Sequence, residues 1–291
     1  ELEAERNVNG AARNADQQFV TLSGGWGQLR VGEMLNAATI VHNQAPGAGA
    51  AFSDIDTFLN PATMVTGMAS QVTTVDGIAD AGAGSNAIDY ITPMFGPFAL
   101  GVTYTPRVLS RGLAQELGAT LKDLLGVAGV YADKWGPVGV NFDIAYARFD
   151  SSGANGALAQ GMSQGMPIGM KLTYGSWEVG GSYFRIWDNL KDDATTTDGS
   201  FDGSSWDAGI AYATGNWKFG YQYYHSSFEG ATNTKGRDKQ SIHNLGSAYT
   251  MGPGVTATAN LAYERNHDEQ GTTDASKRYG YGLVTGLLLA F

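Results

Sequence analysis

The stretch Trp135-Gly-Pro-Val-Gly-Val-Asn-Phe-Asp-Ile-Ala-Tyr146 joins a short aromatic turn to a segment whose neighbouring residues differ in character. Every second residue from Val138 to Tyr146 is large and apolar, and the residues between them are Gly, Asn, Asp and Ala. This period of two predicts a β-strand with two different faces. Similar turns at Gly175-Ser-Trp177 and Gly215-Asn-Trp217 put residues 136, 176 and 216 at equal intervals. The repeat therefore predicts a series of long β-hairpins.

Later stretches repeat this alternation, with apolar residues in the middle of each strand and Trp or Tyr near its ends, as in 204–214, 217–228 and 255–266. Aromatic residues at both ends of an apolar band about 25 Å tall are typical of membrane-crossing strands. Tight turns alternate along the chain with longer polar stretches such as 150–165, which is the loop pattern of outer-membrane barrels. A soluble barrel fits any single strand, but the aromatic ends favour a transmembrane antiparallel up-and-down β-barrel.

The composition agrees with an all-β membrane protein. The chain has 41 Gly among 291 residues and 16% charged residues, yet its mean hydropathy is only −0.19, because alternation hides the apolar face from any average. The net charge of −10 argues against nucleic acid as a partner. With no Cys, the chain has no disulfide or thiolate metal site. We expect these residues to face lipid: Val138, Phe142, Ile144, Ile210, Phe219 and Leu261.

The alternation predicts fourteen strands in a single β-barrel domain over residues 1–291. The interval from Leu35 to Ser85 shows no alternation and is too long for a hairpin connection. A loop of that length in a compact fold usually has a function. The predicted strands are 1–6, 17–22, 28–34, 86–92, 98–105, 122–134, 138–149, 166–175, 177–188, 204–214, 217–228, 241–250, 255–266 and 277–291.

Two motifs beside this interval resemble the general porins of Gram-negative outer membranes, in particular those of the α-proteobacterial type. Phe19-Val-Thr-Leu-Ser-Gly-Gly-Trp-Gly-Gln-Leu-Arg-Val-Gly32 is similar to the family's strand-turn-strand before its third loop. Asn86-Ala-Ile-Asp-Tyr-Ile-Thr-Pro-Met-Phe-Gly96 is similar to the hairpin after that loop. The sequence ends on Phe291, like the terminal aromatic that the family presents to the barrel-assembly machinery. The resemblance also implies a homotrimer in contact with outer-membrane lipid and lipopolysaccharide.

The family topology differs from the predicted strand count. General porins have sixteen strands, and their third loop joins the fifth strand to the sixth. Here the long interval joins the third predicted strand to the fourth, and the sequence opens inside an alternating stretch at Glu1. We therefore expect that two N-terminal strands and part of a third are absent, so that about fourteen of sixteen strands are represented. A true fourteen-stranded barrel is the alternative.

The resemblance implies that residues 35–85 fold inward and form the constriction of a water-filled lumen. A barrel of sixteen strands is too wide for side chains to fill. The interval contains no Lys or Arg, and we expect its acidic residues Asp54, Asp56, Asp76 and Asp80 to line the constriction. Strand parity places Arg30, Lys171 and Lys218 on the lumen face, and the resemblance implies that basic residues of the wall face the acidic loop across the constriction. Ordinary solvated lumen charges are the alternative interpretation of any one of these residues.

These features predict a porin for passive diffusion of ions and small hydrophilic solutes, with a size limit and a mild preference for cations. A substrate-specific outer-membrane channel is the alternative, and it would need an aromatic or charged rail along the lumen, to which Tyr224 and Phe184 could contribute. A barrel enzyme would need a Ser-His pair on the outward face, which no predicted strand supplies. We therefore expect no catalytic activity.

Other motifs have simpler explanations. Gly161-Met-Ser-Gln-Gly165 matches the G-x-S-x-G pattern of hydrolases, but that pattern requires a strand-to-helix turn, and this copy leads into a strand. The four His residues lack metal-ligand spacing. We expect no cofactor and no metal site. A divalent cation bound through carboxylates is a weak alternative for one polar loop, which contains Asp192, Asp193, Asp198 and Asp202.

Overall fold

The computed structural model describes residues 2–3, 17–52, 55, 59, 85–108, 119–153, 161–187, 202–229, 237–268 and 277–290. Within these residues no helix is long and apolar enough to cross a membrane. Apart from the short helix α1 (Ala37–Val41) and the helical residues Phe52, Ile55 and Leu59, the regular elements of the described residues are strands. They are β1 (Leu2–Glu3), β2 (Gln17–Gly24), β3 (Gly27–Met34), β4 (Ser85–Ile91), β5 (Phe98–Val108), β6 (Ala119–Trp135), β7 (Val138–Gly153), β8 (Gly161–Tyr174), β9 (Trp177–Trp187), β10 (Gly203–Thr214), β11 (Trp217–Glu229), β12 (Arg237–Gly252), β13 (Val255–His267) and β14 (Lys277–Leu289).

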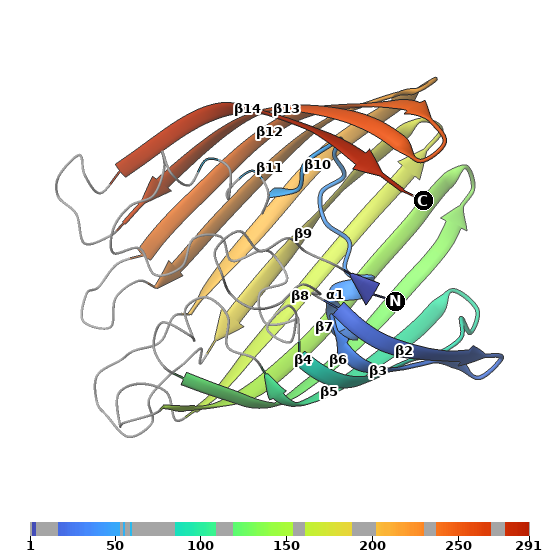
Figure 1. The fold of residues 1–291 in the computed structure, drawn as a ribbon, viewed down its shortest axis with the longest axis vertical. Coiled ribbons are helices and arrows are strands. Elements are labelled where there is room, and N and C mark those ends of the chain that lie inside the picture. The colour runs from blue at the N-terminus through green and yellow to red at the C-terminus, as the bar shows by residue number, and fades with distance from the viewer. Residues whose placement is uncertain are drawn as a thin grey trace.

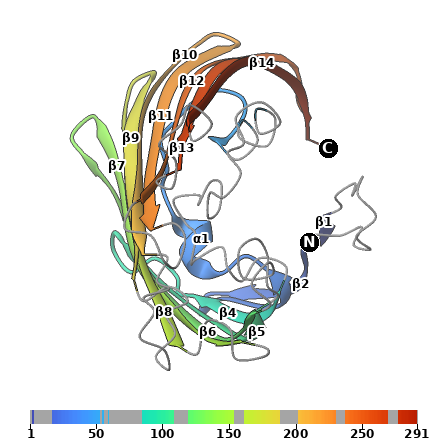
Figure 2. The same ribbon diagram turned by 90° about the vertical axis from the view of Figure 1, so that its left-hand side faces the viewer.

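The strands form one antiparallel sheet in which each strand pairs with its neighbours in the sequence, from β1 to β14 (Figure 1). The sheet curls into a barrel wall, and α1 lies on its concave side (Figure 2). The predicted all-β, up-and-down barrel with fourteen strands in this chain is confirmed. Among the described residues β1 and β14 are the two edges of the sheet. The count of sixteen strands in the intact protein stays a prediction.

The two faces of the wall are as the alternation predicts. In β11, Phe219 and Tyr221 are exposed on the convex face, whereas Gly220, Gln222 and Tyr224 are buried on the concave face. Most of the residues expected to face lipid are exposed, and Val138 is half-buried. The exposed ones are Phe142, Ile144, Ile210, Phe219 and Leu261.

The repeated turns have a common backbone geometry. Gly136 and Gly215 have φ angles of 62° and 53°, in the left-handed region that glycine adopts without steric cost. Each is the first residue of a two-residue connection, the position that a type II′ hairpin turn reserves for Gly. The aromatic residue beside each turn, such as Trp135 or Trp217, is exposed on the outer face. Together these residues explain the periodic turn motif in the sequence.

Strand β8 begins five residues earlier than the sequence predicts. Gly161 to Gly165 lies inside the strand, with Ser163 buried on the lumen side and Met162 exposed on the outer side. Met162 is the only large apolar residue among these five, which is too weak an apolar signal for the prediction to place the boundary here. Because no helix follows this stretch, it does not have the strand-to-helix turn that a G-x-S-x-G nucleophile requires.

Candidate pore constriction

The segment that follows β3 runs along the inner wall, across β5 to β13. We call residues 36–52 the tethered segment, because hydrogen bonds attach it to one strand after another. It begins at α1, where the Asn36 side chain accepts a hydrogen bond from the Thr39 backbone N–H at 3.1 Å and caps the helix. The Ala37 N–H donates to Thr103 Oγ1 of β5 at 2.7 Å.

The small side chains of α1 allow close packing against the wall. Ala38 is fully buried and packs against Ala128 of β6 and Ala145 of β7. Larger residues at these positions would hold the helix away from the strands. The helix therefore lies flat on the inner surface of β5 to β7.

Asp143 of β7 holds the next residues of the tethered segment. Its carboxylate contacts His42 Nδ1 and accepts hydrogen bonds from the backbone N–H and the side-chain Nδ2 of Asn43, each at 2.7 Å. The side chains of His42 and Asp143 are almost completely buried. A buried carboxylate with several hydrogen-bond donors is a strong anchor, because charge-assisted hydrogen bonds are about twice as strong as neutral ones.

A second carboxylate anchors the segment on β10. Asp207 Oδ1 accepts from the backbone N–H groups of Ala45 and Ser182, at 2.9 and 2.8 Å, and the Ser182 hydroxyl donates to Oδ2 at 2.9 Å. On β11, Gln222 Nε2 donates to the Ala45 carbonyl at 2.7 Å. Ala45 is thus fixed through both of its backbone polar groups.

Two amides of β12 and β13 complete the attachment. Asn260 donates to the Ala48 carbonyl at 2.9 Å and accepts from the Ala50 N–H at 3.0 Å. Asn244 donates to the Ala50 carbonyl at 3.2 Å and accepts from Asn260 at 2.9 Å. It also donates to Gln222 at 2.9 Å. The three amides therefore form a connected ladder beneath the segment.

Glycines in the wall make room for the tethered segment. A Cβ atom at Gly209 would lie 2.6 Å from the Pro46 carbonyl oxygen, and one at Gly220 would lie 2.8 Å from the Ala48 nitrogen. Gly246 and Gly169 likewise have no space for a side chain, because backbone atoms of the segment fill it. The high glycine content of the lumen face thus allows backbone to lie directly on backbone.

Apolar contacts hold the segment beyond these hydrogen bonds. Phe52, Ile55 and Leu59 are helical and buried, at the spacing that places them on one helix face. The Phe52 ring lies 5.5 Å from that of Tyr224. Tyr224 and Phe184 face inward as the sequence predicts, but both are fully buried. They do not form an exposed aromatic rail along the lumen.

The three predicted basic residues lie on the inner side of the wall, in different surroundings. Arg30 is buried and paired with Asp89, which stands opposite it on β4 and also accepts from Thr103 at 2.6 Å. Lys218 pairs with Glu178 at 3.0 Å, with both side chains about one-third exposed. Lys171 makes no hydrogen bond or ion pair with the residues that the structure describes.

The predicted constriction residues Asp54, Asp56, Asp76 and Asp80 lie outside the described residues, as do Asp192, Asp193, Asp198 and Phe291. Asp202 is described, directly before β10, and its carbonyl accepts from the Glu229 N–H at 2.8 Å. In the described ranges no cluster of His, Asp or Glu has the arrangement of a metal site. The role of these acidic residues and the limits of 35–85 as a constriction loop stay predictions.

Sequence reasoning missed the anchoring residues. The alternation had placed Asp143, Asp207, Gln222 and Asn260 on the inner face but gave no reason to separate them from other lumen residues. These residues have one feature in common. Each is a carboxylic acid or an amide near the middle of a strand, and each lies close to an inward-facing glycine. That signal becomes specific only when the segment crossing the strands is known.

A curled antiparallel sheet with a segment fixed across its inner surface defines an outer-membrane β-barrel channel. Among solved structures, the outer membrane channel DcaP of Acinetobacter baumannii is 12% identical over 98% of this chain and 78% of that chain, with a TM-score of 0.63. OmpT of Vibrio cholerae is 12% identical over 95% and 79%, with a TM-score of 0.57. A porin refined at 1.8 Å resolution is 16% identical over 93% and 80%, with a TM-score of 0.56. At these identities the likeness shows the fold alone.

The sequence itself identifies the family. A family model described as Gram-negative porin matches residues 1–269, and the chain belongs to this family. No curated protein matches the sequence. The family and the fold together make the chain a channel-forming protein of the bacterial outer membrane. Its assignment to the α-proteobacterial type stays a prediction.

Proposed function

We propose that the chain forms a general, size-limited channel for passive diffusion of ions and small hydrophilic solutes, with a mild preference for cations and no catalytic activity. The observation that carries this proposal is the attachment of the tethered segment across the inner wall. Anchors on β5, β7, β10, β11 and β13 fix its backbone. A segment held at so many points narrows the lumen permanently, as a size limit requires.

The charges of the described lumen residues support a cation preference. Arg30 and Lys218, two of the three basic residues predicted to line the constriction, each have a carboxylate partner. Each pair contributes little net charge to the lumen. The segment 35–85 contains four Asp and no Lys or Arg, so its acidity sets the sign of the local charge. Such a region concentrates cations.

Replacement of the four loop carboxylates tests the selectivity. We expect zero-current potentials in a salt gradient to indicate cation preference, which declines as salt screens the charges over a Debye length of about 10 Å at 0.1 M. The change of all four residues to Asn should reduce this preference and leave the barrel folded. An unchanged reversal potential would mean that the selectivity arises elsewhere. The variant replaces Asp54, Asp56, Asp76 and Asp80.

A general channel is favoured over a substrate-specific one because the side chains of Phe184 and Tyr224 are fully buried. They therefore offer no aromatic surface to a solute in the lumen. Liposome swelling with neutral sugars of graded size tests this choice. A general channel should give rates that fall smoothly with sugar mass. A single sugar that enters much faster than others of its size, with saturation, would instead indicate a substrate-specific channel.

We further propose that the protein is a homotrimer in contact with outer-membrane lipid and lipopolysaccharide, and that Phe291 is recognised by the barrel-assembly machinery. Family membership supports these proposals. The mass of the native protein in detergent tests the trimer, and the insertion yield of a Phe291→Ala variant tests the assembly signal. A monomeric mass, or a normal yield, would contradict the respective proposal.

A further inference from the structure

Three lysines on the inner wall lie between the tethered segment and the tight turns that join the strands. Lys171 of β8 is one inward position beyond Gly169, where the Asn43 backbone fills the space of a side chain. Lys218 of β11 is likewise one inward position beyond Gly220, against which the tethered segment also packs. One inward position is about 7 Å along a strand. Both lysines therefore lie directly beside the segment, on its tight-turn side.

The third lysine, Lys134 of β6, was not among the residues predicted for the constriction. From Leu125 onward its strand pairs with β7 in unbroken register, so Lys134 shares a face with Ala128, which packs against α1. Lys134 is exposed and stands opposite Gly139. That position is two inward positions beyond Asp143, or about 14 Å along the strand. Lys134 thus lies nearer the tight-turn end of the lumen than the other two lysines.

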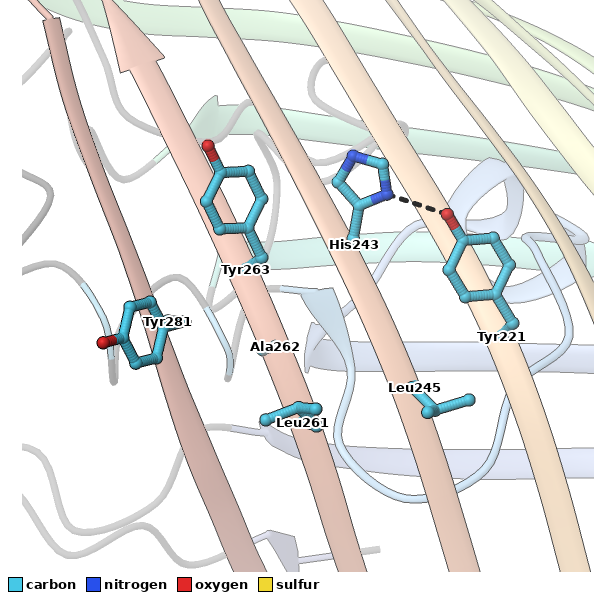
Figure 3. Close-up of a pocket in the computed structure, with 7 residues that line it drawn as sticks. All are labelled: Tyr221, His243, Leu245, Leu261, Ala262, Tyr263 and Tyr281. Carbon is cyan, nitrogen blue, oxygen red and sulfur yellow. Dashed lines mark hydrogen bonds between the residues drawn. The ribbon is translucent and has the colours of Figure 1, made fainter.

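The outward residues of the neighbouring strands agree with this assignment of faces. Figure 3 shows Tyr221 of β11 and Leu245 of β12 on the outer surface, where they line an apolar groove. The Tyr221 hydroxyl and His243 Nδ1 are 2.8 Å apart there. Because successive side chains of a strand point to opposite faces, Lys218, an odd number of residues from Tyr221, points inward. At this part of the wall the outer side is apolar and the charges are inside.

The three lysines give the tight-turn end of the lumen a positive charge. Lys218 is paired with Glu178 at 3.0 Å, so this pair contributes little net charge. Lys134 and Lys171 form no ion pair with the residues that the structure describes. Within the described wall between the tethered segment and the tight turns, no further inward side chain is charged. We call Lys134 and Lys171 the exit lysines, because the tight turns mark the periplasmic end of an outer-membrane barrel.

The constriction next to the exit lysines has the opposite sign. The interval 35–85 contains four Asp and no Lys or Arg. Two further carboxylates, Asp143 and Asp207, bind its backbone to the wall. The fixed charge of the channel therefore changes sign along the channel axis, from acidic at the constriction to basic at the periplasmic exit.

A change of sign along a channel makes the current depend on the direction of the voltage. Each charged zone concentrates the opposite ion. When the long-loop side is positive, cations arrive through the acidic zone and anions through the basic zone, so both ions accumulate where the zones meet. The opposite voltage draws both ions away from this junction and depletes it. The current should therefore be larger when the long-loop side is positive.

We propose that Lys134 and Lys171 make the open channel rectify and limit its cation preference. The proposal rests on the acidic constriction proposed above, but it concerns the direction of the current. The exit lysines lie about 7–14 Å from the tethered segment along their strands. This is similar to the Debye length of about 10 Å at 0.1 M salt, whereas the length is only about 3 Å at 1 M. Rectification should therefore be present in dilute salt and disappear in concentrated salt.

Current–voltage curves of the folded protein in planar bilayers test the proposal. Because the sequence has no Cys, an Asn216→Cys variant can be biotinylated at one tight turn only. Streptavidin should then reduce the current only from the chamber that faces the tight turns, which gives the orientation. In 0.1 M KCl the current with the long-loop side positive should exceed the current at the opposite voltage about twofold. The ratio should fall to about one at 1 M.

Three double variants separate lumen charge from other effects. Lys134→Gln with Lys171→Gln should bring the current ratio to about one in dilute salt and increase the cation selectivity. The corresponding Lys→Arg double variant keeps both charges and should rectify as wild type does. The matched control, Lys239→Gln with Lys277→Gln, removes two charges from exposed positions on the outer face of β12 and β14. It should leave the current ratio unchanged. Open-channel currents show that each variant is folded and inserted.

Two results would overturn the assignment to the exit lysines. One is a current ratio in the Gln double variant equal to that of wild type, and the other is a larger wild-type current with the long-loop side negative. A wild-type channel with cation preference but equal currents in both directions would overturn this proposal and leave the proposed selectivity intact. A channel without cation preference would overturn the acidic constriction and this proposal with it.

Discussion

Substitution of Gly220 by Ala should loosen the tethered segment from the wall. A Cβ at this position would lie 2.8 Å from the Ala48 nitrogen and 2.8 Å from the Gly47 carbonyl carbon. Non-bonded heavy atoms rest at about 3.5–4.0 Å, so the segment must retreat by about 0.7–1.2 Å. Such a shift breaks the two adjacent hydrogen bonds, from Asn260 to Ala48 at 2.9 Å and from Gln222 to Ala45 at 2.7 Å.

The expected loss of free energy follows from these two hydrogen bonds. Each contributes about 0.5–1.5 kcal/mol net, so together they are worth about 1–3 kcal/mol. The population of the detached segment should therefore rise about 5- to 150-fold. The barrel should remain folded, because alanine is tolerated on the lumen face of a strand and no lipid-facing residue changes.

Single-channel recording in planar bilayers and hydrogen exchange of the backbone amides of residues 45 and 47–50 measure this effect. We expect noisier and larger conductance, together with faster exchange. The matched control is Gly126→Ala, also on the inner wall, where the nearest atoms to a new Cβ are Thr103 Cβ at 3.9 Å and Asn36 Oδ1 at 4.0 Å. If Gly220→Ala matched this control in conductance, noise and exchange, the inference that the segment depends on close backbone contact would be refuted.

Three more substitutions test the inner wall. Arg30→Ala should leave Asp89 as an unpaired buried carboxylate and lower the free energy of unfolding by about 3–5 kcal/mol in urea titrations; a loss below about 1 kcal/mol would contradict a buried ion pair. Lys218→Gln breaks a partly exposed ion pair with Glu178, so the free energy of unfolding should change by less than about 1 kcal/mol. The reversal potential should shift in the direction of greater cation selectivity. An unchanged reversal potential would mean that permeating ions do not sense this charge. Phe52→Ala should remove about 3–5 kcal/mol of apolar packing from the tethered segment and speed exchange of the Ile55 amide, and unaltered exchange would show that the polar anchors suffice.

Alternation was a reliable guide to the wall because it reports a local property. A strand between lipid and lumen must place its side chains on two faces with a period of two. The start of β7 and both ends of β11 were therefore located to within one residue from apolar residues alone, whereas β7 extends four residues beyond its predicted end. Where large apolar residues are sparse, as in the first part of β8 with Met162 alone, the same rule gave too little signal and the strand was predicted too short.

The constriction was predictable only in outline. The length of the interval after Leu35, its acidity and its likeness to the porin third loop predicted a segment inside the barrel. Parity also placed Arg30, Lys171 and Lys218 on the lumen face. It did not reveal that Arg30 is neutralised by Asp89, because pairing depends on which residues stand opposite one another across two strands.

The sequence by itself determined the class of fold, the face of the wall on which strand residues lie, and the family. Local periodicity and short motifs are enough to indicate all three. Only the tertiary structure decided what those residues do. Asp143, Asp207 and Asn260 became anchors because one segment crosses their strands. The physical reason is that hydrogen bonds and ion pairs act over a few ångströms between groups far apart in the sequence, so their partners are fixed by the folding of the whole wall.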